Sequence, residues 1–191
     1  MISSLGSIPA SSAAQTTPAS FPVKPTPAEC TVEPRPAGAV HALLGTPAPT
    51  PTAADEPQAH TPAVVDIPVG QPADRALQME ITSVVRELYA CFNAGDSLRA
   101  FALASDDFLK NFVAEGSLTT QDIDFLLSEP VPVPVEDRTT ILAITDMSRF
   151  ETGRAGAFVI TFDRFNGADT VYMTLVHQGN RWLVNEIVDF L

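Results

Sequence analysis

The side chains able to do acid–base chemistry are few and lie near the carboxyl end of the chain. Glu186 and Asp189 fall in the last predicted strand, and His177 ends the strand before it. The two acids have opposite parity, so at most one faces the interior, where a carboxylate with a raised pKa could act as a general acid or base. His177 would have to face the same pocket with a carboxylate such as Glu186 beside it. The structural alternatives are a solvated outer face or dimer-interface salt bridge for the acids and a hairpin-end position for His177.

The other polar groups that could bind a ligand or catalyse a reaction are better explained by roles in the fold. Asp106 and Asp107 are adjacent carboxylates, but a helix is predicted to begin there and its dipole favours acids. The run Gly153-Arg154-Ala155-Gly156 lacks a strand–loop–helix context and is predicted to be a turn rather than a phosphate-binding loop. One histidine and one cysteine in the C-terminal part cannot make a zinc site, and no Asp-rich calcium loop is present. We therefore expect no metal and no cofactor.

The chain contains two cysteines. Cys30 lies in the Pro-rich part and Cys91 lies inside a helical pattern, and such a pair gives neither a disulfide framework nor metal-ligand spacing. Cys91 is predicted to be a small buried hydrophobe. Cys30 either pairs between chains or is free.

The composition divides the chain into two parts. Of 17 prolines, 14 lie from Pro9 to Pro72, whereas 13 of the 14 aromatic residues follow that segment. A segment of Ala, Thr, Ser and Pro has little large apolar surface to offset an ordering cost of about 1–2 kcal/mol per residue. Residues 1–72 are therefore predicted to be a disordered tail or linker, and residues 73–191 a folded domain.

Charge and hydropathy limit the partners. The formal net charge of −12 would repel phosphate backbones, so nucleic acid is not an expected partner. No run of 18 or more apolar residues occurs, and no transmembrane segment is predicted. The N-terminus lacks the basic and apolar regions of a signal peptide. A Pro/Thr-rich linker before a small domain is nevertheless common downstream of export signals, so an extracytoplasmic location is favoured.

The first half of the folded part has helical periodicity. A long amphipathic helix begins after Asp74, an N-cap residue type, and ends at Gly95, which can adopt the left-handed conformation. Three short helices follow, the second capped by Ser105 or Asp106, and the third by Thr119 in a box with Asp122. The apolar stripe of the long helix consists of Leu77, Ile81, Val84, Leu88 and Cys91.

The second half predicts a four-stranded antiparallel meander. The strands cover residues 140–150, 157–165, 170–177 and 181–190, and turn signals separate them. Phe158, Ile160 and Phe162 share one face of a strand while Val159 and Thr161 share the other, so one face suits burial better than its reverse. Helices followed by antiparallel strands indicate an α+β fold in which the long helix covers one face of a curved sheet.

The part from Asp74 onward resembles the nuclear-transport-factor-2-like superfamily, and its SnoaL-like and ketosteroid-isomerase-like branches most. The residues that carry the resemblance are the run 84–96 with its Asn-Ala-Gly-Asp turn, the Asp-Asp segment at 104–108, and Asn180-Arg181-Trp182-Leu183-Val184. The resemblance implies a cystatin-like cone, often a homodimer formed through the sheet, with a pocket at its wide end. We expect that pocket to be lined by Leu88, Tyr89, Phe92, Phe101, Phe112, Tyr172 and Trp182.

The resemblance also allows a catalytic test. In the isomerase branch a tyrosine on the first helix forms the oxyanion hole and a later carboxylate is the base, and these positions fall on Leu88 and near Phe112. Neither side chain can do this chemistry, and Tyr89 and Glu115 are displaced from the two positions. We expect a non-catalytic domain for small-ligand binding or dimerisation. The alternatives are a small isomerase, dehydratase or cyclase with an acid–base residue in the pocket, or a subunit that only supports a partner.

Overall fold

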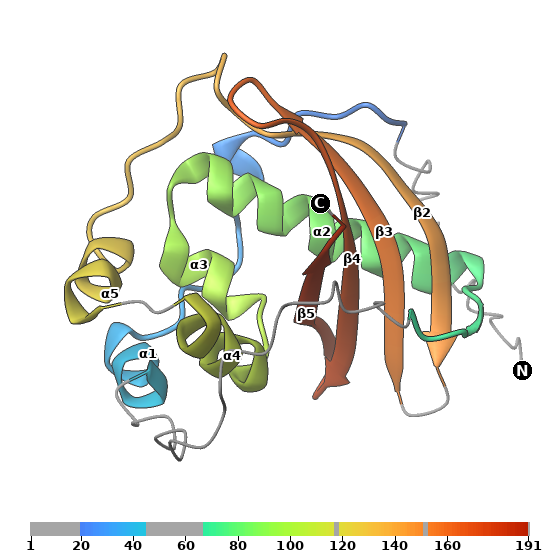
Figure 1. Ribbon diagram of the computed structural model, residues 1–191, viewed down its shortest axis with the longest axis horizontal. Helices are drawn as coiled ribbons and strands as arrows, with labels where there is room; N and C mark the ends of the chain where they lie inside the picture. Colours follow the sequence, from blue (N-terminus) through green and yellow to red (C-terminus); the bar gives the residue numbers. More distant parts are fainter. Residues whose placement is uncertain (1–19, 45–66, 117–118, 151–152, 191) are drawn as a thin grey trace, which may run out of the picture.

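The computed structural model describes residues 20–44, 67–116, 119–150 and 153–190, and within them the chain has an α+β fold (Figure 1). Five strands form one antiparallel sheet in sequence order. The strands are β1 (Gln71–Pro72), β2 (Thr140–Phe150), β3 (Arg154–Asp163), β4 (Gly167–Gln178) and β5 (Arg181–Asp189). The helices are η1 (Pro27–Glu29), α1 (Ala37–Leu44), α2 (Arg75–Ala94), α3 (Ser97–Ala102), α4 (Asp106–Gly116) and α5 (Thr120–Leu126).

The sheet has one strand more than the four predicted. The additional strand is β1, which pairs with β2 so that Gln71 lies opposite Arg149 and Pro72 opposite Ser148. A strand of two residues is too short to show the alternation of apolar and polar side chains that reveals a strand. A proline is tolerated at a sheet edge because its missing N–H need not face a neighbour. The four longer strands are confirmed in their predicted order, but β3 begins at Arg154, so the prediction of a turn over residues 153–156 is wrong for its last three residues.

The ends of the helices follow the predicted capping chemistry. The Asp74 side chain accepts a hydrogen bond of 2.9 Å from the Leu77 N–H at the start of α2. Gly95 ends α2 with φ of 65°, a left-handed conformation that glycine adopts without steric cost. Thr119 and Asp122 form the reciprocal capping box of α5.

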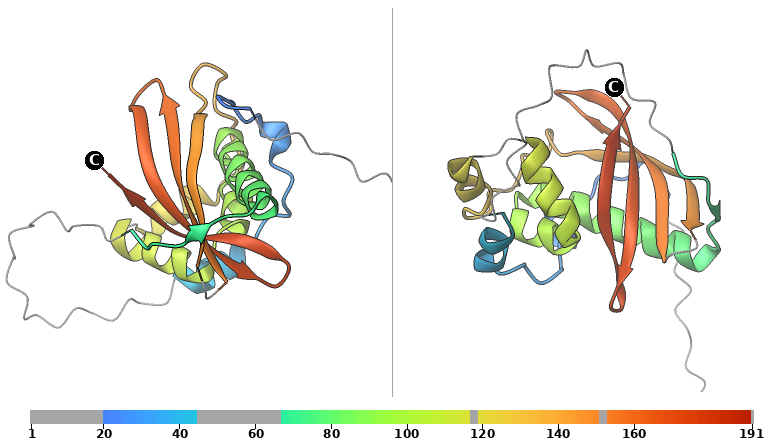
Figure 2. Two further views of the ribbon diagram at one scale, coloured as in Figure 1. Left: turned by 90° about the vertical axis from the view of Figure 1, so that its right-hand side faces the viewer. Right: turned by 60° about the horizontal axis from the view of Figure 1, so that its bottom comes forward.

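Helix α2 lies across one face of the sheet (Figures 1 and 2). Its buried stripe packs into one core cluster with side chains of β3, β4 and β5. On β3 this core face carries Ala157 and Val159, both fully buried, whereas Phe158, Ile160 and Phe162 alternate onto the outer face. The larger apolar side chains of β3 therefore point away from the helices. The α2 stripe consists of Leu77, Ile81, Val85 and Leu88.

Residues 20–44, here called the N-terminal strap, are part of the folded domain. The strap pairs with β2 through Val23 and Ile141, whose N–H groups each donate to the other's carbonyl. Its helix α1 packs beside α4 and buries Val40 completely. The predicted domain boundary near residue 73 is thus wrong for this segment. The sequence misses the strap because its contacts with the domain are scattered and follow no helical or strand periodicity. The predicted disorder of residues 1–19 and 45–66 concerns residues outside those described.

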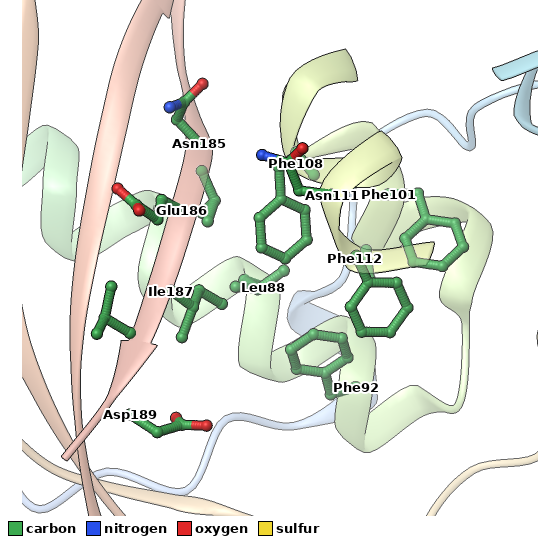
Figure 3. A pocket seen from close by; sticks show the side chains of 14 residues that line it. Leu88, Phe92, Phe101, Phe108, Asn111, Phe112, Asn185, Glu186, Ile187 and Asp189 are labelled. Carbon is green, nitrogen blue, oxygen red and sulfur yellow. The ribbon is translucent and has the colours of Figure 1, made fainter. Parts of the chain in front are cut away.

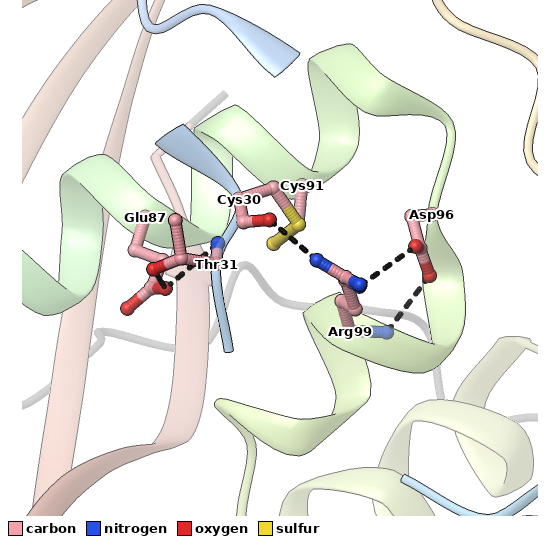
Figure 4. The surroundings of a disulfide bond; sticks show 6 residues. All are labelled: Cys30, Thr31, Glu87, Cys91, Asp96 and Arg99. Atoms are coloured by element: carbon pink, nitrogen blue, oxygen red, sulfur yellow. Dashed lines mark hydrogen bonds and ion pairs between the residues drawn. A yellow bond between two sulfur atoms is a disulfide. The ribbon is translucent and has the colours of Figure 1, made fainter. Parts of the chain in front are cut away.

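A disulfide between Cys30 and Cys91 joins the strap to α2 (Figure 4). The expectation of a buried free thiol at Cys91, and of a free or intermolecular Cys30, is therefore wrong. The sequence does not reveal the pairing, because 61 positions separate the two residues and the Pro-rich composition of the strap predicts disorder. Next to the bond, Arg99 donates to the Cys30 carbonyl at 2.8 Å, and Thr31 donates to the Glu87 carboxylate from both its N–H and its hydroxyl.

Two polar side chains complete the attachment of the strap. Asn93, which is 2% exposed, donates to the Pro25 and Thr139 carbonyls and accepts from the Thr139 N–H. Arg35 donates to the Phe101 and Ala104 carbonyls. These bonds satisfy backbone groups that would cost about 1–3 kcal/mol each if they were buried without a partner. The strap is therefore held by specific polar pairing as well as by the disulfide.

We expect the disulfide to stabilise the domain by about 4 kcal/mol, because it closes a loop of about 60 residues in the unfolded chain. Reduction should lower the midpoint of chemical unfolding by an amount of that order. It should also expose the strap to thermolysin before Val32 and Val40, sites that the folded strap protects. Urea unfolding and mass spectrometry of the digest measure the two effects.

The matched control is the double variant Cys30→Ala/Cys91→Ala, which lacks both thiols. Its stability should equal that of the reduced protein and should not respond to reductant. Equal stability of the oxidised and reduced wild-type chains would contradict the expected role of the bond.

Candidate functional site

A cavity of about 720 Å³ lies between the helices and the last strand of the sheet (Figure 3). One side, here called the helix wall, is formed by α2, α3, α4 and the α3–α4 connection. The other side, the strand wall, is formed by residues 184–189 of β5. A volume of this size is in the range of roughly 300–1,000 Å³ that small-molecule sites occupy.

The helix wall is aromatic and aliphatic. Phe101, Phe108 and Phe112 form a chain of ring contacts, with centroid separations of 6.4 and 6.0 Å. Phe92 and Leu88 extend this surface along α2. The helical stripes of the sequence fix these positions, since Leu88 and Phe92 are one turn apart on α2, as are Phe108 and Phe112 on α4. Ala100, Ala104 and the polar Asn111 complete this wall.

The strand wall carries the acids of the site. Glu186 and Asp189 both belong to the lining, with Asn185, Ile187 and two valines. In Figure 3 Ile187 and Asp189 face the helices, whereas Glu186 extends to the other side of β5. An irregularity in the pairing with β4 lies between residues 184 and 186, where the simple alternation of the strand is interrupted.

Four of the seven expected pocket-lining residues line the cavity: Leu88, Phe92, Phe101 and Phe112. Of the other three, Trp182 is buried in the core and donates from its indole N–H to Glu80 at 2.7 Å. Tyr172 stacks edge to face on Phe158 across the outer face of the sheet, and Tyr89 packs against the core beside Phe92.

The remaining acid and histidine candidates lie outside the cavity lining. His177 is exposed and contacts the Trp182 ring with a centroid distance of 5.0 Å, so it is not beside Glu186 or Asp189 in the cavity. Asp106 pairs with Arg35 of the strap, and Asp107 lies 3.7 Å from Lys110. Asp106 therefore holds the strap and is not part of a carboxylate pair facing a ligand.

Tyr89 has the most perturbed hydroxyl next to the site. Burial raises the pKa of Tyr89 to about 12, the negative charges of Asp169 and, more weakly, Asp189 raise it as well, and a hydrogen bond with Thr161 opposes them. The phenol therefore stays protonated at neutral pH and its bond to Thr161 fixes its position. Such a group is a hydrogen-bond donor or acceptor, not a base.

Eight lining residues were not among the expected site residues: Ala100, Ala104, Phe108, Asn111, Val184, Asn185, Ile187 and Val188. Phe108 could have been found, since it precedes Phe112 by one helical turn. Asn111 follows from the same helix only once the position of the cavity is known. Asn185 and Ile187 depend on the irregularity in β5, which leaves no trace in the sequence.

Two kinds of site or segment are absent from the described part of the chain. No group of three or more His, Cys, Asp or Glu side chains is placed to hold a metal ion among residues 20–44, 67–116, 119–150 and 153–190. Across those same residues, every helix is too short or too polar to span a bilayer.

The raised pKa of Tyr89 gives a prediction for alkaline pH. In the folded chain Tyr89 keeps the proton that free tyrosine loses near pH 10. Its contribution to the free energy of unfolding is therefore fully present below about pH 10 and is lost as pH rises through about 12. The ultraviolet titration of tyrosinate should contain a component near pH 12 that Tyr89→Phe removes. It should persist in Tyr172→Phe, and its survival in Tyr89→Phe would contradict the assignment.

Comparisons with known proteins give no relative for this chain. No protein-family model matches it, and neither the curated proteins nor the solved structures contain a match.

Proposed function

We propose that this protein binds a small, largely apolar molecule in the cavity between the helix wall and the strand wall, without catalysing a reaction. The observation that carries the proposal is the exposure of Phe92 and Phe112, which are 45% and 40% exposed although they line a concave site. Burying such rings under a ligand releases about 25 cal/mol per Å² of apolar surface. Exposed aromatic rings gathered in a cavity are typical of binding sites.

The cone of the nuclear-transport-factor-2-like superfamily is the fold we propose for this domain. Its support is a long helix, α2, across one face of an antiparallel sheet, with a cavity where the helices and the sheet diverge. Leu88 and Phe112 both line that cavity. At these positions the isomerase branch needs an oxyanion donor and a base, and their apolar side chains favour binding over proton abstraction.

A small isomerase, dehydratase or cyclase is the second candidate. Asp189 and Glu186 favour it, because both line the cavity and a carboxylate can take a proton from a bound substrate. It ranks lower because the lining residues that the structure describes include no histidine, and the Tyr89 hydroxyl is already hydrogen-bonded to Thr161. The acid would have to act without a nearby proton donor.

We also propose that the domain forms a homodimer through the outer face of its sheet. Phe158, Ile160 and Phe162 lie on that face of β3, and Phe190 contacts Phe158 with a centroid distance of 5.5 Å. Phe162 is 44% exposed. An apolar sheet face opposite the helices is the surface that a second copy would cover.

We propose an extracytoplasmic location for this protein, and the disulfide supports it. The disulfide between Cys30 and Cys91 persists in an oxidising compartment, whereas cytosolic reductants break most such bonds.

The ligand proposal predicts that the full chain binds N-phenyl-1-naphthylamine, which is uncharged at neutral pH and fluoresces in apolar surroundings. Phe92→Ala and Phe112→Ala should each weaken binding by about three- to tenfold, because each removes part of the apolar surface that covers the probe. Both rings are partly exposed, so the stability of the fold should change little.

The control is Phe125→Ala on α5, a ring that is 77% exposed and does not line the cavity. This variant should bind the probe like the wild type. Unchanged affinity in both cavity variants, or no binding by the wild-type chain, would overturn the proposal.

The dimer proposal predicts that light scattering gives twice the monomer mass at micromolar concentration. Phe162→Asp should shift the mass to that of the monomer, because it places a charge in the proposed apolar interface. Phe125→Asp adds the same charge on α5 and should leave the mass unchanged. A monomer mass for the wild-type chain across the micromolar range would count against the dimer.

A further inference from the structure

We propose that the ligand of this cavity is an organic cation, an apolar molecule carrying a protonated or quaternary amine that lies between the phenyl ring of Phe92 and the carboxylate of Asp189. This inference rests on the proposed function, since it assigns the chemical class of the ligand in the same cavity. It follows from the distribution of charge and aromatic rings over the two walls.

The helix wall offers aromatic faces to a cation. Four phenylalanine side chains, at positions 92, 101, 108 and 112, line the cavity, and the ring of Phe92 lies across the cavity from Asp189 in Figure 3. The face of an aromatic ring is negatively polarised and attracts ammonium groups within about 6 Å. The same rings supply the apolar contact that the rest of the ligand needs.

The strand wall offers negative charge without a counter-ion. Among the described lining residues the charged ones are Glu186 and Asp189, and none is a lysine, arginine or histidine. Within the described part of the chain neither carboxylate forms an ion pair with another side chain. Asp189 is close enough to α2 for its charge to act on the Tyr89 hydroxyl, which places it at the Phe92 end of the cavity.

Anionic ligands and neutral apolar ligands fit this site less well than a cation. An anion would meet the Asp189 carboxylate and, among the described lining residues, no positive side chain, in a chain of formal net charge −12. A neutral apolar ligand would cover the phenyl rings but would leave Asp189 with a neighbour that cannot neutralise it. A cation is attracted by both walls, and the negative charge of the whole chain raises its local concentration.

Three probes with one scaffold test the inference: 4-phenylbutylamine, protonated at neutral pH, 4-phenylbutan-1-ol and 4-phenylbutyrate. Their affinities for the full chain are measured by NMR titration at low ionic strength. We expect the amine to bind about three- to tenfold more tightly than the alcohol, and the carboxylate to bind most weakly. Added salt should weaken binding of the amine and leave the alcohol unchanged.

Asp189→Asn removes the charge and keeps the shape of the side chain. It should reduce the affinity for the amine to that for the alcohol and leave the alcohol itself unaffected. Asp146→Asn is the matched control: it makes the same charge change at an exposed position of β2, where φ is 50° and asparagine is well accommodated. Binding of the amine should be retained in this variant.

The outcomes separate the two proposals. If the alcohol binds as tightly as the amine, or Asp189→Asn keeps the preference for the amine, the inference is overturned and apolar binding stands. If neither these probes nor N-phenyl-1-naphthylamine bind, the proposed function fails, and the inference with it. If the naphthylamine binds while the amine does not, the inference alone is overturned.

Discussion

Burial of the apolar stripe of α2 against the sheet is the interaction on which the rest of the domain depends. Leu77, Ile81, Val85 and Leu88 are almost completely buried there, and burial of each large apolar side chain contributes about 1.5–3 kcal/mol. The stripe ends at Leu88, one turn before Phe92. Leu88 and Phe92 both line the cavity, so this side of α2 passes from the core into the cavity within one turn.

The last turn of α2 also joins the other parts of the domain. Cys91 carries the disulfide to the strap, Asn93 binds both the strap and the residue before β2, and Gly95 reverses the chain. Gly95 has a left-handed φ, and a Cβ there would lie 2.1 Å from the Val131 carbonyl oxygen, so no other residue fits without displacement of that segment. Three attachments within five residues hold the end of α2 rigidly, and this end carries Leu88 and Phe92 into the cavity.

The sequence predicted those parts of the domain whose signals are local. Asp74, Gly95 and the Thr119–Asp122 box mark helix ends because each acts on backbone groups within one turn. Runs rich in Val, Ile, Thr and aromatic residues, separated by turn signals, revealed the four long strands. The strap and its disulfide were missed because they depend on contacts between distant segments. Four phenylalanine or leucine positions of the cavity were expected from the family resemblance, whereas Tyr172 and Trp182 were misplaced because parity alone does not tell which face of a sheet the helices cover.

The position of the cavity follows from the way β5 is paired at its outer edge. The Val184 N–H donates to the Leu103 carbonyl and its carbonyl accepts from Ser105, so the α3–α4 connection extends the sheet by one short parallel step. The Ser105 hydroxyl donates to the Asn185 Oδ1, and its oxygen accepts from the Phe108 N–H in the first turn of α4. Helix α4 turns away from the sheet at this point, and the strand continues to Asp189 without it. Ser105 thus ends the short pairing with β5 and caps the start of α4. Because α4 leaves the sheet at this residue, the helix wall and the strand wall diverge there and leave the cavity between them.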